Sequence, residues 1–548
     1  MDKKLTRRAF LAAGAVAAVA ATGCAPMART GGEGNAPQAK GEMPEWNEET
    51  DLVVVGSGTA LFAALTAHNE GKDVICFEKA STAGGTMVLS GGAYYVPNNH
   101  LQSQIDYYDV VDSEDEAFEY IKNCDIWETA DDDLLRDYLA RAPKVFEYLT
   151  EQLNVPFYGW AGRDYVLYPG AAIGRSIAIP YGEGDVWGAT AGYQENLMPL
   201  VEASGLDLRL NTEVTRLVQD ENGAVVGVIA KDKSGNDIAC KANVGVILGA
   251  GPFDWNEDMR SRWLSQPLRS SCIVQTCTGD GHRMGLDIGA DFDNMWSVYG
   301  SIGYKSQSEG EMSYRVKEGL NAQMDATCPN TVIVNKSGRR FFNEGCSYHE
   351  KELAMGNLDF RTNPPTDNTT CYLIADARFV QDYGFPGGNP EKPEWVREYA
   401  TLEELAAGEG IDVSALANEI ARFNKFCETG VDEDYHRGES GYEIEYGVGV
   451  DHHYVERPDL ANADLGPIDQ APFYVAEIGA CSYGTSGGIK VDANAQVLRG
   501  GEPVPGLYAC GCNAACIAAC YPGAGWSNGT GTARGMFAVN HMFDLGLF

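Results

Sequence analysis

Apolar runs and Gly-rich turns give the start of the chain a strand–helix–strand rhythm. Residues 51–55 form a short β-branched run that predicts a buried strand. A Gly-containing turn follows, and residues 60–69 then carry apolar side chains at helical spacing. Residues 73–78 predict a second strand. This order is typical of an α/β protein with a Rossmann-like, mostly parallel sheet.

Further along the chain, residues 113–153 predict two or three helices, and residues 206–248 predict several strands. Residues 290–465 lack this alternation of strands and helices and are richer in Pro, Asn and aromatic residues. We therefore interpret them as an inserted α+β domain. A strand followed by glycine returns at 505–511. The predicted segments are a signal peptide (1–23), a flexible linker (24–48), a first domain in two parts (49–289 and 466–548) and the insertion (290–465).

The first residues predict export. Arg7 and Arg8 belong to a basic start, and the apolar run 10–21 is shorter than the roughly 20 residues that span a bilayer. The segment 6–11 resembles a twin-arginine signal, which directs the export of folded proteins. Residues 21–24 resemble a lipoprotein cleavage site. We therefore expect an extracytoplasmic protein, with a lipid anchor at Cys24 as its contact with the membrane.

Composition narrows the choice of partners. The 548 residues include 41 Lys and Arg against 78 Asp and Glu, for a formal net charge of -37. Such an excess of negative charge repels phosphate backbones, so nucleic acid is not an expected partner. We interpret most of the 15 cysteines as buried free thiols, because a chain of this length does not need disulfides to hold its core.

Gly56 and Gly58 predict a dinucleotide site. They follow the first strand and open a helix, where glycine lets the backbone approach a pyrophosphate at the helix N-terminus. Leu61 occupies the position of the usual third glycine. Glu78 ends the second strand, where a carboxylate accepts the ribose hydroxyls of adenosine and disfavours a 2′-phosphate. The alternative is an ordinary glycine turn beside a solvated glutamate.

Later glycine-rich stretches favour flavin over nicotinamide. They are residues 84–86, 90–92 and 248–251, together with Gly529, Gly531 and Gly535 at the start of a C-terminal helix. The positive end of such a helix can stabilise a reduced, anionic flavin.

Four stretches together resemble the FAD-dependent superfamily of fumarate reductase flavoproteins and 3-ketosteroid dehydrogenases: 51–99, 278–284, 334–341 and 505–535. The resemblance implies an FAD domain interrupted in sequence by a capping domain, with the substrate held between them. It implies FAD contacts from Gly56, Gly58, Thr59, Ala60, Glu78, Lys79, Gly84, Gly85, Thr86, Ser90, Gly91, Gly92, Val214, Ala250, Gly251, Asp280, Gly511, Gly529 and Thr530.

Two tyrosines point to the ketosteroid branch. Tyr348 stands where the fumarate reductase branch has its proton-delivering arginine and the ketosteroid branch a catalytic tyrosine. Tyr521 and Gly525 resemble the pair whose hydroxyl and amide bind the 3-keto oxygen in that branch. The stretch 165–169 resembles one that carries a supporting tyrosine, and we favour Tyr168 over Tyr165. The alternatives are a core tyrosine at 348 and a structural turn at 521–525.

The sequence therefore predicts an FAD-dependent oxidoreductase that reduces or forms a C=C bond conjugated to a ketone or lactone, in a steroid-like enone. No recognisable nicotinamide site is present, so we expect a separate electron carrier such as a cytochrome or quinol. An iron–sulfur cluster at Cys510, Cys512, Cys516 and Cys520 is not favoured, and no metal site is predicted. The alternatives are a reductase of an unsaturated carboxylic acid, resembling fumarate reductase, and a lipid-anchored flavin-binding protein without activity.

Overall fold

The computed structural model describes residues 43–105, 112–165, 168–183, 190–305, 322–443 and 457–548. The predicted signal peptide, and Cys24 within the linker, lie outside these residues. The helices are α2 (Ala60–Asn69), α3 (Glu114–Cys124), α4 (Asp132–Glu151), α5 (Thr190–Asn196), α6 (Met198–Ser204), α7 (Glu257–Trp263), α8 (Asp280–Ile288), α9 (Ala322–Thr327), α10 (Tyr348–Met355), α11 (Ala377–Tyr383), α12 (Leu402–Glu409), α13 (Val413–Thr429) and α15 (Trp526–Phe543).

The strands are β1 (Glu48–Val55), β2 (Val74–Phe77), β3 (Ala93–Tyr95), β4 (Tyr158–Trp160), β5 (Ser176–Ala178), β6 (Asp207–Arg209), β7 (Glu213–Gln219), β8 (Val225–Lys231), β9 (Asp237–Leu248), β10 (Ser270–Ser271), β11 (Phe292–Asp293), β12 (Val298–Tyr304), β13 (Thr331–Asn335), β14 (Leu358–Asp359), β15 (Thr366–Asp367), β16 (Cys371–Ala375), β17 (Arg397–Tyr399), β18 (Phe473–Thr485), β19 (Gly488–Ile489), β20 (Gln496–Arg499) and β21 (Glu502–Ala509).

The first sheet has eight strands, and its main path runs β20-β21-β9-β1-β2-β6. The pairs β21–β9, β9–β1, β1–β2 and β2–β6 are parallel. In β1, Leu52 and Val54 enter one hydrophobic cluster, while Val53 and Val55 enter another on the opposite face. Burial on both faces explains why this strand is apolar without alternation.

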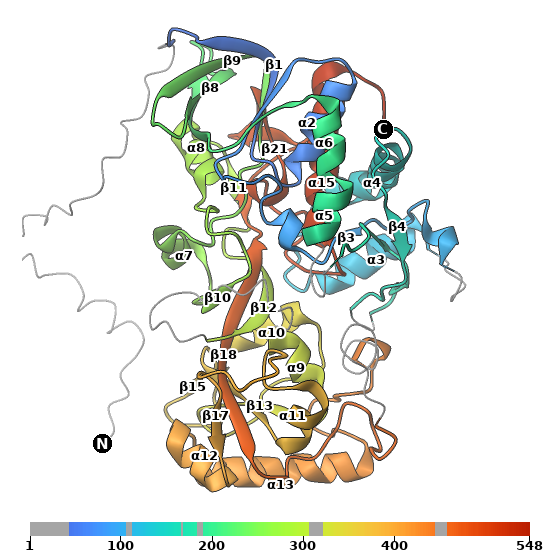
Figure 1. The fold of residues 1–548 in the computed structure, drawn as a ribbon, viewed down its shortest axis with the longest axis vertical. Coiled ribbons are helices and arrows are strands. Elements are labelled where there is room, and N and C mark those ends of the chain that lie inside the picture. Colours follow the sequence, from blue (N-terminus) through green and yellow to red (C-terminus); the bar gives the residue numbers. More distant parts are fainter. Residues whose placement is uncertain (1–42, 106–111, 166–167, 184–189, 306–321, 444–456) are drawn as a thin grey trace, which may run out of the picture. The chain divides into compact units, whose positions relative to one another are not determined.

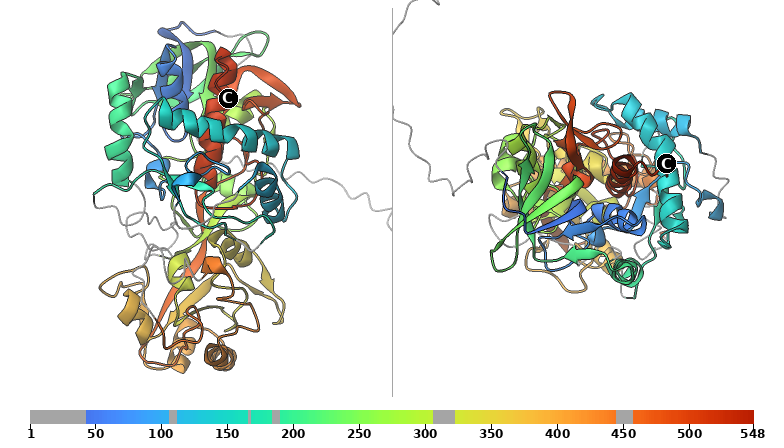
Figure 2. Two further views of the ribbon diagram at one scale, coloured as in Figure 1. Left: turned by 90° about the vertical axis from the view of Figure 1, so that its right-hand side faces the viewer. Right: turned by 90° about the horizontal axis from the view of Figure 1, so that it is seen from above.

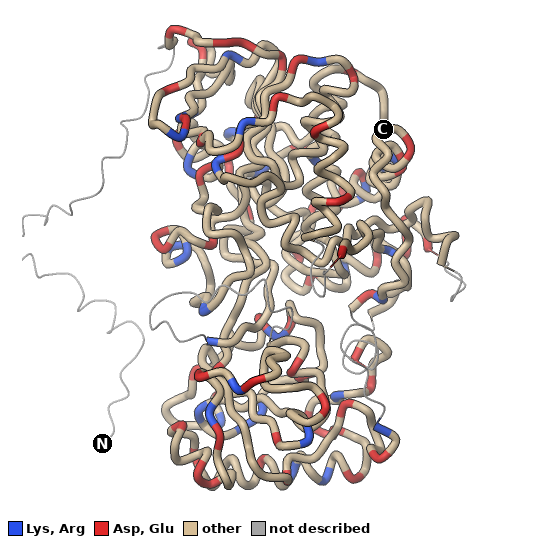
Figure 3. Tube along the Cα trace, in the orientation of Figure 1, with Lys and Arg blue, Asp and Glu red and all other residues tan. Residues whose placement is uncertain are grey.

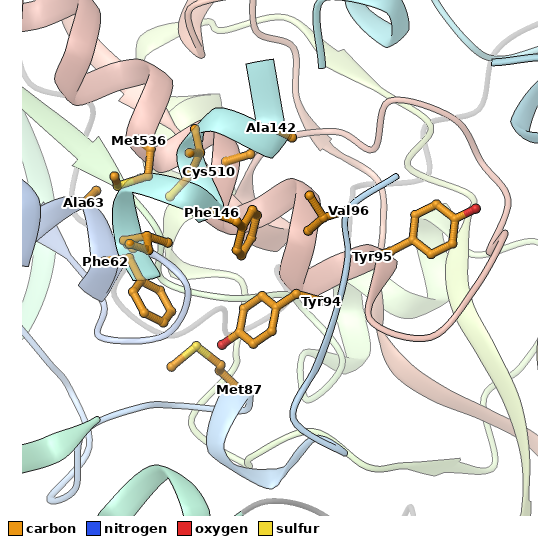
Figure 4. Packing of buried hydrophobic residues seen from close by; sticks show 14 of the residues in the cluster. Phe62, Ala63, Met87, Tyr94, Tyr95, Val96, Ala142, Phe146, Cys510 and Met536 are labelled. Carbon is orange, nitrogen blue, oxygen red and sulfur yellow. The ribbon is translucent and has the colours of Figure 1, made fainter. Parts of the chain in front are cut away.

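Helices α2 and α15 pack against each other beside β1 and cover one face of this sheet (Figures 1 and 2). Small residues allow the close approach: a Cβ at Gly535 of α15 would lie 3.3 Å from the Cβ of Ala63 on α2. The same cluster continues into α4, where the rings of Phe146 and Tyr94 lie 5.5 Å apart (Figure 4).

The second sheet is built around the long strand β18. Strands β12, β16 and β17 pair with it antiparallel, β10 pairs with it in parallel, and β13 pairs with β16. Helices α12 and α13 contribute to the hydrophobic cluster on one face of this sheet, and α9 and α11 to the cluster on the other (Figure 1).

The structure agrees with the α/β class predicted from the sequence, and α2 has the predicted bounds. The domain limits remain predictions. Strand β18 lies after the predicted boundary at 466, yet it hydrogen-bonds to the strands of the predicted insertion. No helix among the described residues is long and apolar enough to cross a membrane. Acidic residues are spread along the described chain and interspersed with basic ones (Figure 3).

Candidate active site

A cavity of about 400 Å³ extends from the carboxyl ends of β1 and β2 to residues of the second sheet. Its walls come from segments far apart in sequence: the turn after β1, the segment 85–93, the loop 249–252, the segment 272–277 and the turn before α15. Ligands of open α/β sheets bind at the carboxyl ends of the strands, so this position fits a nucleotide cofactor.

The turn after β1 is shaped for close backbone contact. Gly56 has φ +93°, and a Cβ there would lie 2.3 Å from the carbonyl oxygen of Gly249. A larger residue would therefore separate β1 from the loop after β9. Gly511, at the end of β21, also has positive φ, and a Cβ there would lie 2.8 Å from the hydroxyl of Thr59. These glycines leave the backbone open to the cavity, which is the arrangement that a pyrophosphate requires.

Glu78 is held by this turn. One carboxylate oxygen, Oε2, accepts hydrogen bonds from the Ser57 amide at 2.9 Å and the Ser57 hydroxyl at 2.6 Å. The other, Oε1, accepts from the Ala80 amide at 2.7 Å. The side chain is 7% exposed and lines the cavity. A carboxylate held in this position can accept ribose hydroxyls, and the ribose contact of Glu78 stays a prediction.

A second polar group lies near Glu78. The Lys79 ammonium donates to Asp280 at 2.9 Å and to Thr278 at 2.9 Å, and it lies 3.6 Å from Glu213. The ammonium is thus neutralised by two carboxylates. Of the described residues that line the cavity, Lys79 is the one Lys or Arg.

Most of the predicted cofactor residues come together here. Those that line the cavity are Gly56, Gly58, Thr59, Glu78, Lys79, Gly85, Thr86, Ser90, Gly91, Val214, Ala250, Gly251, Asp280 and Gly511. Ala60, Gly84, Gly92, Gly529 and Thr530 do not line it. At the α15 N-terminus, Ser527 and Asn528 line the cavity instead, because Gly529 faces Tyr95, whose carbonyl oxygen would lie 2.4 Å from a Cβ at that position.

Four tyrosines, Tyr165, Tyr348, Tyr483 and Tyr521, contact one another at the cavity wall, and we call them the tyrosine cluster. The hydroxyls of Tyr165 and Tyr348 are 2.8 Å apart. The ring of Tyr348 lies 5.3 Å from that of Tyr521 and 5.4 Å from that of Tyr483. Tyr348, Tyr483 and Tyr521 line the cavity, and Tyr165 lies behind them.

Burial keeps the three lining phenols, Tyr348, Tyr483 and Tyr521, protonated. It raises the pKa values of Tyr348 and Tyr483 well above their usual value near 10. Burial also raises the pKa of Tyr521, and hydrogen-bonding groups of Tyr348, Ser527 and the Gly525 amide partly oppose this rise. The cluster can therefore donate hydrogen bonds or protons to a neutral, polarisable ligand.

The segment that carries Tyr521 is fixed from two sides. Gly525 begins α15 with φ +84°, and a Cβ there would lie 2.3 Å from the Ala93 carbonyl group. The Tyr120 hydroxyl donates to the Pro522 carbonyl at 2.7 Å and accepts from the Tyr165 amide at 3.0 Å. Tyr120 therefore joins the segments that carry Tyr165 and Tyr521.

The structure differs from the sequence prediction at Tyr168. This residue is half-buried and does not line the cavity, whereas Tyr165 contacts both Tyr348 and Tyr521. The spacing of the two residues in the sequence does not reveal this difference. Sequence reasoning also missed Tyr483, which lines the cavity from β18.

The cysteines near the C-terminus are free thiols in the structure, and burial raises the pKa values of Cys510, Cys512 and Cys516 to about 12. Among the described residues no group of three or more His, Cys, Asp or Glu side chains could hold a metal ion.

Comparison with known proteins decides the family. The FAD binding domain family matches residues 51–527. The chain belongs to this family. It is 30% identical to 4-oxocyclohexanecarboxylate 2-dehydrogenase of Sinomonas cyclohexanicum, over 89% of this chain and 92% of the relative. It is 29% identical to 3-oxosteroid 1-dehydrogenase of Mycolicibacterium smegmatis, over 90% and 97%.

A crystal structure of 3-ketosteroid delta1-dehydrogenase from Sterolibacterium denitrificans, in complex with 1,4-androstadiene-3,17-dione, matches with a TM-score of 0.79 and 26% identity. The match covers 90% of this chain and 99% of that one. These findings confirm the family resemblance, the fold and FAD as the cofactor predicted from the sequence. This protein is therefore an FAD-dependent oxidoreductase that acts on CH–CH bonds.

Proposed function

We propose that this protein reduces or forms a C=C bond conjugated to a ketone or lactone carbonyl in a steroid-like enone. The observation that carries the proposal is the tyrosine cluster, in which Tyr348 is hydrogen-bonded to Tyr165 and lies against Tyr521 at the cavity wall. Such phenols suit the proton transfer and carbonyl polarisation that this reaction needs. The relatives named as dehydrogenases of oxo compounds support the same class of substrate.

Each residue has a defined task in this proposal. Bound FAD would supply the hydride transfer to or from one carbon of the C=C bond. The Tyr348 hydroxyl exchanges a proton with the neighbouring carbon, and the Tyr165 hydroxyl orients it. The Tyr521 hydroxyl and the Gly525 amide donate hydrogen bonds to the carbonyl oxygen and stabilise the enolate as it develops. The buried rings of the cluster exclude water from this end of the cavity.

The charge of the lining favours a neutral substrate. The one lining Lys or Arg among the described residues is Lys79, which follows β2 and is paired with Asp280 and Glu213. A dicarboxylate at the tyrosine cluster would lack a described lysine or arginine partner there, and burying an unpaired carboxylate is costly.

The direction, the partner and the location complete the proposal. We place the protein outside the cytoplasm after twin-arginine export, with an anchor at Cys24, and expect it to work as a reductase. Its electrons would come from a separate carrier such as a cytochrome or quinol.

The test is anaerobic reoxidation of the chemically reduced holoprotein, followed by flavin absorbance. Steroid-type enones should reoxidise the flavin rapidly and fumarate should not. Reoxidation by unsaturated acids alone would overturn the proposal in favour of a carboxylic acid reductase. Unchanged flavin with every enone and acid, and with saturated ketosteroids offered to the oxidised protein, would favour a binding protein.

A further inference from the structure

Two thiols meet at the wall of the cofactor cavity. Cys272 follows β10 and lines the cavity near Tyr483, and Cys481 lies in β18, where it pairs with Ser270 of β10. The sulfur atoms of Cys272 and Cys481 are 3.7 Å apart. Neither thiol has a place in the reaction proposed above.

The surrounding backbone holds these thiols together. The Cys272 amide donates to the Ser482 carbonyl at 2.9 Å. The buried carboxylate of Asp254 accepts from the Ser271 hydroxyl at 3.0 Å and from the Thr485 amide at 2.8 Å. Asp254 thus links β10 to β18 beside the thiol pair. The strand pairing therefore fixes the backbones of Cys272 and Cys481 next to each other.

The pair is also chemically suited to oxidation. A disulfide has a sulfur–sulfur distance of about 2 Å, so the two sulfur atoms would have to approach each other by roughly 1.7 Å. Because Cys272 lies two residues beyond Ser270, the strand partner of Cys481, closing the bond also requires a small shift of the backbone after β10. The hydrogen bond from Cys272 lowers the pKa of the Cys481 thiol, and the thiolate is the reactive form of cysteine. Cys481 is 2% exposed, so external thiols have little access to it.

We propose that Cys272 and Cys481 form a dithiol–disulfide couple that exchanges two electrons with the FAD of the same chain. In the forward direction both S–H bonds break and one S–S bond forms. The two thiols lose two electrons and two protons, and oxidised FAD accepts them as FADH2. In the reverse direction FADH2 reduces the disulfide, and no further reductant is required. The couple stores a second electron pair beside the reaction site.

An anaerobic reductive titration of the air-oxidised holoprotein tests this proposal. A flavin alone takes up about two electrons per FAD, whereas a flavin coupled to a disulfide takes up about four. We expect about four for the native protein and about two for both Cys272→Ser and Cys481→Ser. The control is Cys427→Ser, which removes a buried thiol of α13 and should leave the value at about four.

Mass spectrometry gives a second readout that does not depend on the variants. Peptides of the oxidised holoprotein should contain a Cys272–Cys481 disulfide, and dithionite should abolish it. An uptake of two electrons by the native protein, or a lack of the cross-linked peptide, would overturn the proposal. Neither measurement needs an enone, so failure of the thiol couple is distinguishable from failure of the proposed function.

Discussion

The hydroxyl oxygens of Tyr165 and Tyr348 lie 2.8 Å apart, although the two residues are separated by 183 positions in the chain. Tyr348 is the first residue of α10, and Tyr165 belongs to the segment between β4 and β5. The contact orients the Tyr348 hydroxyl at the cavity wall. After Tyr348 has donated its proton, the neighbouring Tyr165 hydroxyl can supply another.

Tyr348→Phe should slow enone-dependent flavin reoxidation by roughly 100-fold or more, because it removes the proposed proton donor. Tyr165→Phe should have a smaller effect, roughly tenfold, since it removes one hydrogen bond to that donor. Rapid-mixing measurements of flavin absorbance would give both rates. Tyr168→Phe is the matched control and should react at the native rate. Equal loss in Tyr168→Phe and Tyr165→Phe would contradict the assignment of Tyr165.

Tyr120→Phe should lower the free energy of unfolding by about 1–3 kcal/mol, because the Pro522 carbonyl and the Tyr165 amide lose the hydroxyl that bonds to both of them. The Tyr165 amide would retain a 3.4 Å contact with the Pro522 carbonyl, and the two segments would be less firmly fixed. We also expect a lower kcat, as Tyr165 and Tyr521 lose their relative position. Denaturant unfolding and steady-state kinetics measure these effects. Tyr148→Phe removes a half-buried hydroxyl bonded to Glu70 and should leave kcat unchanged.

Glu78→Gln should weaken FAD binding by roughly 10- to 100-fold. The amide is neutral and replaces one acceptor oxygen by a donor, so it loses charge-assisted hydrogen bonds worth about 1.5–3 kcal/mol. Titration of the apoprotein with FAD, followed by flavin fluorescence, measures the change. Glu213→Gln alters a neighbouring carboxylate that contacts Lys79 at 3.6 Å and should have a much smaller effect. Native affinity in Glu78→Gln would exclude a ribose-binding role for Glu78.

The unfolding free energy should fall as the pH rises from about 5 to 8. Burial raises the pKa of Glu352 to about 8 and that of Glu350 to about 7, from usual values near 4.5. At a pH between the usual and the raised pKa, each of these carboxyl groups has lost its proton in the unfolded chain and keeps it in the folded chain. Rising pH therefore favours unfolding. Thermal unfolding across this range should show the trend, and Glu352→Gln should reduce its slope. Glu147→Gln changes an exposed carboxylate on α4 and should not alter it.

Much of the cofactor end of the site could be predicted from sequence. Gly56 and Glu78 lie at the ends of two adjacent parallel strands, and their spacing alone places them at one edge of a sheet. The C-terminal helix was predicted too, but the residues of it that line the cavity were not. Gly529 and Thr530 are small, as residues in contact with a cofactor often are, yet they pack inside the protein. Ser527 and Asn528 of the first turn line the cavity instead.

The sequence by itself determined the local elements, because the strand and helix periods and the glycine turns act over a few residues. It also predicted the cofactor class, since each of the glycine-rich stretches that favour flavin can be recognised from neighbouring residues. Only the tertiary structure decided that Tyr165 rather than Tyr168 contacts Tyr348, and that Cys272 meets Cys481. Both contacts join segments that are separated by long stretches of chain. They therefore depend on how β10, β18 and α10 pack, which the spacing of residues in the sequence does not predict.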